Sequence, residues 1–233
     1  MKYTSDSSKS YSELSSKQLS DYLIFRDLPA IANKYISGDR VLDYGCGTGR
    51  SSRLLSERGY EVAAVDVSKE MLRKAREVSD KEKYVYITSG VIPAKDGEFD
   101  AVVSTLTFFE IPTLDEMQQI VDEMARVLKD NGIVIMATSA EGYPYGTWRT
   151  IASELKPNNE RFRSGDVLHN RILCTDLVFD DYYWTDRDQI GVFEKAGFQL
   201  VELLHPLGKK EDGVDWKDEW HTSPWSIFVF QKQ

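Results

Sequence analysis

Residues 41–50 read Val-Leu-Asp-Tyr-Gly-Cys-Gly-Thr-Gly-Arg, a short apolar run that ends in an acid and passes directly into a glycine-rich turn. A segment compatible with a helix, residues 51–58, comes after the turn. This order predicts a parallel strand, a tight loop and a helix N-terminus in series. Gly45, Gly47 and Gly49 would let a ligand lie against the backbone, because no Cβ stands in the way.

A second apolar run, residues 62–65, ends in Asp66, where a second strand would finish. A carboxylate at the end of that strand can accept hydrogen bonds from both hydroxyls of a ribose. The glycine turn and this acid together predict a nucleoside-binding α/β site.

The spacing of the glycines distinguishes between three kinds of nucleotide site. A dinucleotide fingerprint, Gly-x-Gly-x-x-Gly, would need a third glycine where the chain has Arg50. A phosphate-binding P-loop would need Gly-Lys-Ser/Thr after the turn, which the sequence lacks. Asp43 inside the motif would repel a pyrophosphate and suits a cationic ligand that carries an amino group. A nicotinamide-dependent oxidoreductase is therefore a disfavoured alternative.

From about residue 40 to 139, and more weakly from about 177, the chain resembles the class I S-adenosylmethionine (SAM)-dependent methyltransferases, with Asp-x-Gly-x-Gly-x-Gly at residues 43–49. The resemblance implies a Rossmann-like α/β fold: a seven-stranded, mostly parallel sheet with helices on both faces and an antiparallel C-terminal hairpin. It also implies SAM as cofactor and S-adenosylhomocysteine as product. Ligands in such sheets lie outside the carboxyl ends of the strands.

The resemblance also implies a role for each matching position. Asp43 would offset the ammonium group of the methionine moiety, directly or through water, and Asp66 would hold the ribose hydroxyls. Thr105 would offer its carbonyl to the ammonium, and Tyr11 would close over the cofactor. The other expected cofactor-binding residues surround the methionine moiety or the adenine: Gly45, Cys46, Gly47, Gly49, Val67, Met71, Ser89, Gly90 and Val91.

Adenine recognition departs from the family pattern. Members usually carry an acid near the end of the third strand, whereas residues 88–91 read Thr-Ser-Gly-Val. We therefore expect recognition of the adenine to depend more on backbone groups or on a hydroxyl.

Transfer from a sulfonium is an in-line displacement, for which a protein mainly supplies alignment and excludes water. A base is needed only if the acceptor is protonated. The candidate catalytic residues are Glu110, which closely follows the fourth expected strand, and His169. The three histidines are too scattered to predict a metal site.

Two segments bear on the chemical class of the methyl acceptor: the residues after the fourth expected strand, and an insertion. Residues 104–110 do not match the Asn/Asp-Pro-Pro-Tyr/Phe of enzymes that methylate exocyclic amines of nucleobases. Residues 140–176 break the regular alternation, and a segment of this length inside a compact domain is usually functional. Small-molecule members of the family carry lids in this position, so the resemblance implies an inserted substrate lid. We expect a small aromatic or heterocyclic acceptor, methylated at N or O; the alternatives are a protein methyltransferase and a non-catalytic SAM-binding protein. The residues expected to contact the acceptor are Phe108, Phe109, Tyr143, Trp148 and Trp184.

Periodicity predicts the remaining elements. Pro29 is expected to divide residues 14–36 into two helices, because proline fits a first helical turn better than an interior. Helices are also expected over residues 68–78, 113–128, 147–155 and 186–196, and strands over 40–43, 61–66, 84–88, 99–105, 133–138, 177–184, 199–205 and 226–230.

Length and composition predict a single domain over residues 1–233, with an arm and helices over 1–36. No apolar run approaches the ~20 residues of a membrane span, and no signal segment is apparent. Two cysteines do not make a disulfide framework, so we expect a reduced, cytoplasmic protein. A net charge of −9 without a local basic patch disfavours a nucleic-acid partner. The oligomeric state stays open.

Overall fold

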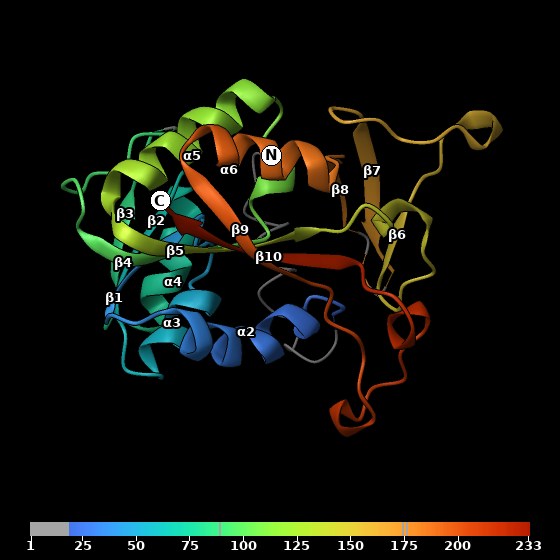
Figure 1. Ribbon diagram of the computed structural model, residues 1–233. Coiled ribbons are helices and arrows are strands. Elements are labelled where there is room, and N and C mark those ends of the chain that lie inside the picture. Colours follow the sequence, from blue (N-terminus) through green and yellow to red (C-terminus); the bar gives the residue numbers. More distant parts are fainter. Residues whose placement is uncertain (1–18, 89, 174, 176) are drawn as a thin grey trace.

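The computed structural model describes residues 19–88, 90–173, 175 and 177–233. Its main sheet has seven strands in the order β3-β2-β1-β4-β5-β10-β9 (Figure 1). β10 runs antiparallel to β5 and to β9, and the other neighbours are parallel, which confirms the expected Rossmann-like sheet with its antiparallel C-terminal hairpin. The strands are β1 (Arg40–Tyr44), β2 (Glu61–Asp66), β3 (Lys83–Tyr86), β4 (Phe99–Thr105), β5 (Leu128–Ser139), β9 (Phe198–Leu204) and β10 (Trp225–Lys232).

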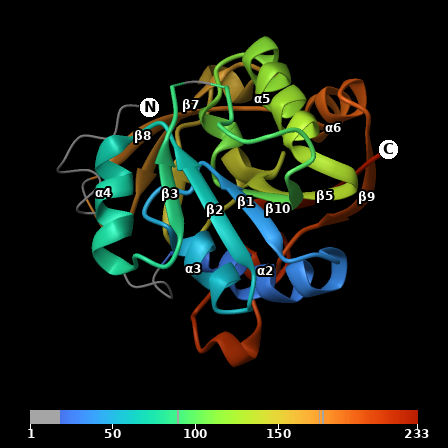
Figure 2. The same cartoon turned by 90° about the vertical axis from the view of Figure 1, so that its left-hand side faces the viewer.

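Helices cover both faces of this sheet (Figure 2). On one face lie α2 (Tyr22–Tyr35), α3 (Arg50–Ser56) and α4 (Lys69–Val78); on the other lie α5 (Leu114–Val127) and α6 (Asp186–Lys195). Side chains alternate along a strand, so neighbouring residues join different cores. Val41 and Val103 pack with the apolar side of α2, whereas Leu42 and Val102 pack with α5 and α6. None of the described helices is long and apolar enough to cross a membrane.

A second, antiparallel sheet of three strands comes between β5 and α6 in the sequence, and it lies to the right in Figure 1. Its strands are β6 (Ile151–Ser153), β7 (Val167–Ile172) and β8 (Val178–Tyr182). The helix expected over residues 147–155 is therefore wrong. Ile151 instead pairs with Ile172, and both side chains are buried, so pairing across the insertion overrides the local helical spacing.

Two further local predictions are wrong. Pro29 lies inside α2 and does not divide it, because Leu28 and Ile31 are buried against the sheet on either side of it. This burial offsets the ~3 kcal/mol that an interior proline costs a helix. Strand β5 begins at Leu128, five residues before the expected start at 133, and includes Asn131 in a left-handed conformation (φ 60°).

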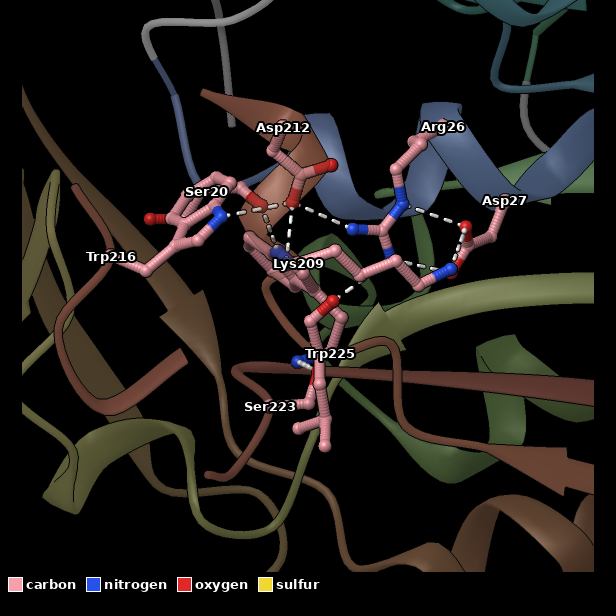
Figure 3. A network of polar contacts seen from close by, with 9 residues as sticks. Ser20, Arg26, Asp27, Lys209, Asp212, Trp216, Ser223 and Trp225 are labelled. Carbon is pink, nitrogen blue, oxygen red and sulfur yellow. Dashed lines mark hydrogen bonds and ion pairs between the residues drawn. The ribbon is translucent and has the colours of Figure 1, made fainter. Parts of the chain in front are cut away.

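Residues 206–224 leave the main sheet after β9 and dock against α2 (Figure 3). The Arg26 guanidinium donates to Asp212 Oδ2 (2.8 Å) and to the Leu207 carbonyl (2.9 Å). Asp212 Oδ2 also accepts from the Trp216 indole at 2.9 Å, and Trp225 donates its indole N–H to the Ser20 carbonyl. These bonds connect the first half of α2 and the residues just before it to residues 206–224 and to β10.

Replacing Asp212 with alanine is expected to lower the free energy of unfolding by about 3 kcal/mol, because the buried Trp216 indole N–H and one Arg26 N–H both lose their acceptor. Asp27 still pairs with the rest of the Arg26 guanidinium. Asp212 is buried and the Arg26 side chain is 13% exposed, so solvent screens the pair weakly. Urea unfolding followed by tryptophan fluorescence measures the change. Asp130→Ala is the control, because the Asp130 side chain is 92% exposed. Equal stability of the two variants would contradict the prediction.

Candidate functional site

A cavity of about 340 Å³ lies at the carboxyl ends of β1, β2 and β4. Its described wall is built by the glycine loop after β1, the start of α4, the loop after β3, the turn after β4 and the first turns of α5. This is the rim of an α/β sheet at which ligands bind.

Asp66 connects the glycine loop to the start of α4. Its Oδ2 accepts from the Gly47 N–H at 2.8 Å and its Oδ1 accepts from the Ser68 N–H at 2.7 Å. Burial raises the pKa of Asp66, while these backbone donors act in the opposite direction. The carboxylate lines the cavity, where its remaining lone pairs can accept from the hydroxyls of a ligand.

Asp43 lies behind the glycine loop, and it does not line the cavity. Its Oδ2 accepts from the hydroxyls of Ser51 (2.7 Å) and Ser52 (2.5 Å) in α3. Its Oδ1 is buried and has no hydrogen-bond partner among the described residues. Burial raises the pKa of Asp43 to about 6, opposed by the two serine hydroxyls. A buried carboxylate oxygen without a donor fits a site that receives a cation.

The turn after β4 brings polar groups to the cavity. Thr105 lines it, and Leu106 follows in a left-handed conformation (φ 60°) that bulky residues rarely adopt. The Leu106 N–H donates to the Ala137 carbonyl at 2.8 Å, which fixes this backbone. Glu110 lies farther along the same turn and also lines the cavity. Strained backbone of this kind concentrates at functional sites.

The inserted sheet supports Glu110 from behind, since β8 packs against residues 108–110. Asp181 of β8 is buried and accepts from the Asn170 amide at 2.9 Å, and Ser153 donates to the Asn170 carbonyl oxygen. Burial, and then the charge of Glu110, raise the pKa of Asp181 well above its usual range.

The structure brings most of the expected cofactor-binding residues to one cavity. Gly49 instead precedes α3, and the side chain of Val91 is exposed outside the cavity. Tyr11 and Ser89 lie outside the described residues. The expected residues that line the cavity are Gly45, Cys46, Gly47, Asp66, Val67, Met71, Gly90 and Thr105.

His169 does not meet the cavity, so its expected catalytic role is not supported. Its side chain is 60% exposed on β7, and Nδ1 lies 2.7 Å from the Asp180 carboxylate. Strand alternation explains the position, because the neighbouring Leu168 and Asn170 are the residues that face inward.

The expected acceptor-binding aromatic residues are all buried in the two cores, and none lines the cavity. Phe108 packs against Phe193 of α6. The Trp148 indole donates to the Tyr143 carbonyl (2.7 Å), and Trp184 donates to the Ile111 carbonyl (3.1 Å). The structure therefore does not bring the expected acceptor-binding residues to the cavity: Phe108, Phe109, Tyr143, Trp148 and Trp184.

Several wall residues were not predicted. The Arg50 guanidinium lies 3.6 Å from the centroid of the Phe25 ring and donates to Asp21 at 3.0 Å, joining α2 to the glycine loop. Arg50 belongs to the quoted motif, but its contacts depend on α2, which lies elsewhere in the sequence. The other residues are Tyr44, Thr48, Ser51, Ser68, Ile87, Leu106, Thr107, Ile111, Pro112, Glu116, Gln119 and Ile120. Across the described ranges, no group of three or more His, Cys, Asp or Glu residues could hold a metal ion.

Comparison with known proteins agrees with this architecture. Residues 42–136 match the family model described as a methyltransferase domain. The malonyl-[acyl-carrier protein] O-methyltransferase of Enterobacter lignolyticus is 35% identical over 136 residues, which cover 57% of this chain and 52% of the relative. The demethylmenaquinone methyltransferase of Tropheryma whipplei is 28% identical over 70% of this chain and 67% of its own.

A likeness to solved structures extends over nearly the whole chain. The CcbJ methyltransferase of Streptomyces caelestis superposes with a TM-score of 0.70 at 18% identity, covering 97% of this chain and 95% of the other. By sequence, in contrast, the chain spans about half the length of most of the malonyl-[acyl-carrier protein] O-methyltransferases that it matches. The matched region contains β1, the glycine loop, Asp66 and β4, which are the parts that build the cavity. Residues 42–136 thus form a methyltransferase domain, and the whole chain has the fold of solved SAM-dependent methyltransferases.

Proposed function

We propose that this chain transfers the methyl group of SAM to a nitrogen or oxygen atom of a small acceptor that carries an N–H or O–H group. The observation that carries the proposal is the continuity of the cavity, which joins the glycine loop and Asp66 to Glu110. One cavity would then hold the SAM and, next to it, a carboxylate that can act on the acceptor.

The described residues fit the cofactor. The Asp66 carboxylate would accept from the ribose hydroxyls, and a Cβ at Gly47 would meet nothing within 4 Å, so the loop leaves room for a ligand. The buried Asp43 Oδ1 would offset the ammonium group, with a bridging water since Asp43 does not line the cavity. The bound cofactor supplies a sulfonium methyl group that is already activated.

The protein's own part in the reaction is alignment, exclusion of water and receipt of a proton. Transfer forms a carbon–nitrogen or carbon–oxygen bond and breaks the carbon–sulfur bond, and the acceptor loses one proton. Glu110 lines the cavity as a carboxylate that can receive this proton.

The charges of the wall favour a neutral or cationic acceptor over a carboxylate. The charged residues of the described wall are Asp66, Glu110, Glu116 and Arg50, and Arg50 is already paired with Asp21. The malonyl-[acyl-carrier protein] relatives are named for a carboxylate acceptor, which makes that acceptor the competing candidate. The aromatic character expected of the acceptor now depends on Phe25 and Tyr44, which line the cavity.

Methyl-labelled SAM, incubated with a panel of small amines and phenols and separately with malonyl-coenzyme A, tests the acceptor class. We expect label on an amine or phenol, together with S-adenosylhomocysteine, and slower turnover in Glu110→Gln. A methyl ester of the malonyl thioester as the sole product would overturn the acceptor class. SAM binding without S-adenosylhomocysteine from any acceptor would favour a non-catalytic binding protein.

SAM binding is expected to strengthen as the pH rises towards the pKa of Asp43, which burial raises to about 6. An ammonium group favours the ionised carboxylate, so binding displaces a proton below that pKa and affinity falls at most about tenfold per pH unit. Above about pH 7 the affinity should level off. Calorimetry from acid to neutral pH checks the slope, and Asp43→Asn should bind more weakly with a smaller slope. An unchanged slope in that variant would refute the assignment.

A further inference from the structure

We propose that Gln119 of α5 recognises the adenine edge of the cofactor, in place of the acid that family members carry near the end of the third strand. This inference rests on the proposed use of SAM and adds the residue that selects its base. Three observations support it: the missing acid, the position of α5 against the loop after β3, and the unpartnered amide of Gln119.

The position of the base follows from Asp66. A ribose held by this carboxylate at the end of β2 places the base towards the neighbouring strand, β3. The cavity wall in this direction is apolar, formed by Val67 and Met71 from the α4 side and by Ile87 from the end of β3. An adenine ring can stack there, but these side chains cannot read its polar edge.

Helix α5 lies beside this part of the wall. Glu123 Oε2 accepts from the Ile92 N–H at 2.9 Å, and the Arg126 guanidinium donates to the carbonyls of Ile92 and Ala94, each at 2.8 Å. These bonds fasten α5 to the loop that comes after β3. Gln119 lies one turn before Glu123, and residues four apart share a helix face. Gln119 accordingly lines the cavity together with Gly90 of that loop.

The amide of Gln119 is available for a ligand. It has no hydrogen-bond partner among the described residues, and its side chain is exposed towards the cavity. The adjacent Gln118 differs on both points: its amide donates to Asp122 at 2.9 Å, and it lines a separate groove between α5 and α6. Gln118 is therefore a suitable control for Gln119, because Gln119 lines the cavity and Gln118 lines the separate groove.

An amide suits the adenine edge better than the nearby carboxylate of Glu116. The edge presents an amino donor next to a ring-nitrogen acceptor, and glutamine can satisfy both with one planar group. A carboxylate accepts from the amino group but repels the lone pair of the ring nitrogen. Glu116 also lines the cavity, so the experiment must distinguish the two side chains.

The test is a double-mutant cycle between the protein and its ligand. Calorimetry compares S-adenosylhomocysteine with its purine analogue, which lacks only the 6-amino group. We expect the wild type to prefer S-adenosylhomocysteine about tenfold, the order expected for one bidentate amide–adenine contact. The preference should fall to about twofold or less in Gln119→Ala, and should persist in Gln118→Ala.

Each other result has a definite meaning. A tenfold preference that survives in Gln119→Ala would overturn the inference, and its loss in Glu116→Ala alone would assign the role to Glu116. A wild type that shows no preference would also overturn it, since the amino group would then not be read. A wild type that binds no S-adenosylhomocysteine would overturn the proposed function itself, so the two failures are distinguishable.

Discussion

Replacing Asp66 with alanine is expected to weaken SAM binding by about two orders of magnitude, because hydrogen bonds to a charged group contribute roughly 1.5–3 kcal/mol each. The variant loses the acceptor for the ribose hydroxyls. It also frees the N–H groups of Gly47 and Ser68, so the glycine loop is no longer tied to the start of α4. Both effects reduce the affinity for SAM.

Isothermal titration with SAM measures the loss of affinity in Asp66→Ala. Glu70→Ala is the matched control on α4, because Glu70 pairs with Arg73 on the exposed side of that helix. Asp66→Asn adds a second comparison, since an amide keeps one acceptor oxygen and should lose less affinity. The assignment of Asp66 fails if alanine at this position leaves the affinity within about threefold of the control, which is less than one ordinary hydrogen bond contributes.

Alanine at Gly45 and at Gly47 is expected to damage the protein in different ways. Both residues have positive φ, 72° and 53°, so each substitution carries about 1–2 kcal/mol of backbone strain. At Gly45 a Cβ would also lie 2.2 Å from Thr107 Oγ1 and 2.6 Å from its Cγ2, which forces the loop and the turn after β4 apart. Gly47 lines the cavity, and a Cβ there would meet no protein atom within 4 Å.

Gly45→Ala should therefore lower the free energy of unfolding by about 3 kcal/mol or more, which combines strain with overpacking. Gly47→Ala should lose only about 1–2 kcal/mol of stability but bind SAM at least about tenfold more weakly, since a ligand must displace the new methyl group. Chemical denaturation and calorimetry on the same samples separate these outcomes. Equal stability of the two variants, or full SAM affinity in Gly47→Ala, would contradict the geometry.

The part of the cavity wall formed by the glycine loop and Asp66 was predictable because its signals are local. A strand, a glycine turn and a helix follow one another within residues 40–56, and the second strand ends in Asp66. The structure confirms the fold that this order implied, with the carboxyl ends of β1, β2 and β4 on one rim. Ser68 and Thr113 also cap α4 and α5, accepting from the backbone N–H groups of Met71 and Glu116.

The acceptor part was not predictable, because burial of an aromatic side chain depends on which surfaces meet. Tyr143 and Trp148 have the composition of a binding wall, but the three strands of the insertion pack them into the core beneath the main sheet. Glu110 was predicted from its distance along the chain after β4, and it does line the cavity. His169 has equally suitable chemistry, but strand alternation directs it to solvent.

Sequence alone determined the sheet with its helices and the positions of the glycine loop and Asp66, because glycine spacing and strand-end acids act within a few residues of one another. Tertiary structure alone decided which side chains reach the cavity from distant segments. Phe25 from α2 and Gln119 from α5 lie far from the motif in sequence, and only the packing of these helices against the sheet brings them to it. The reason is physical: local backbone preferences are encoded residue by residue, whereas a cavity wall forms where separate elements bury their apolar faces.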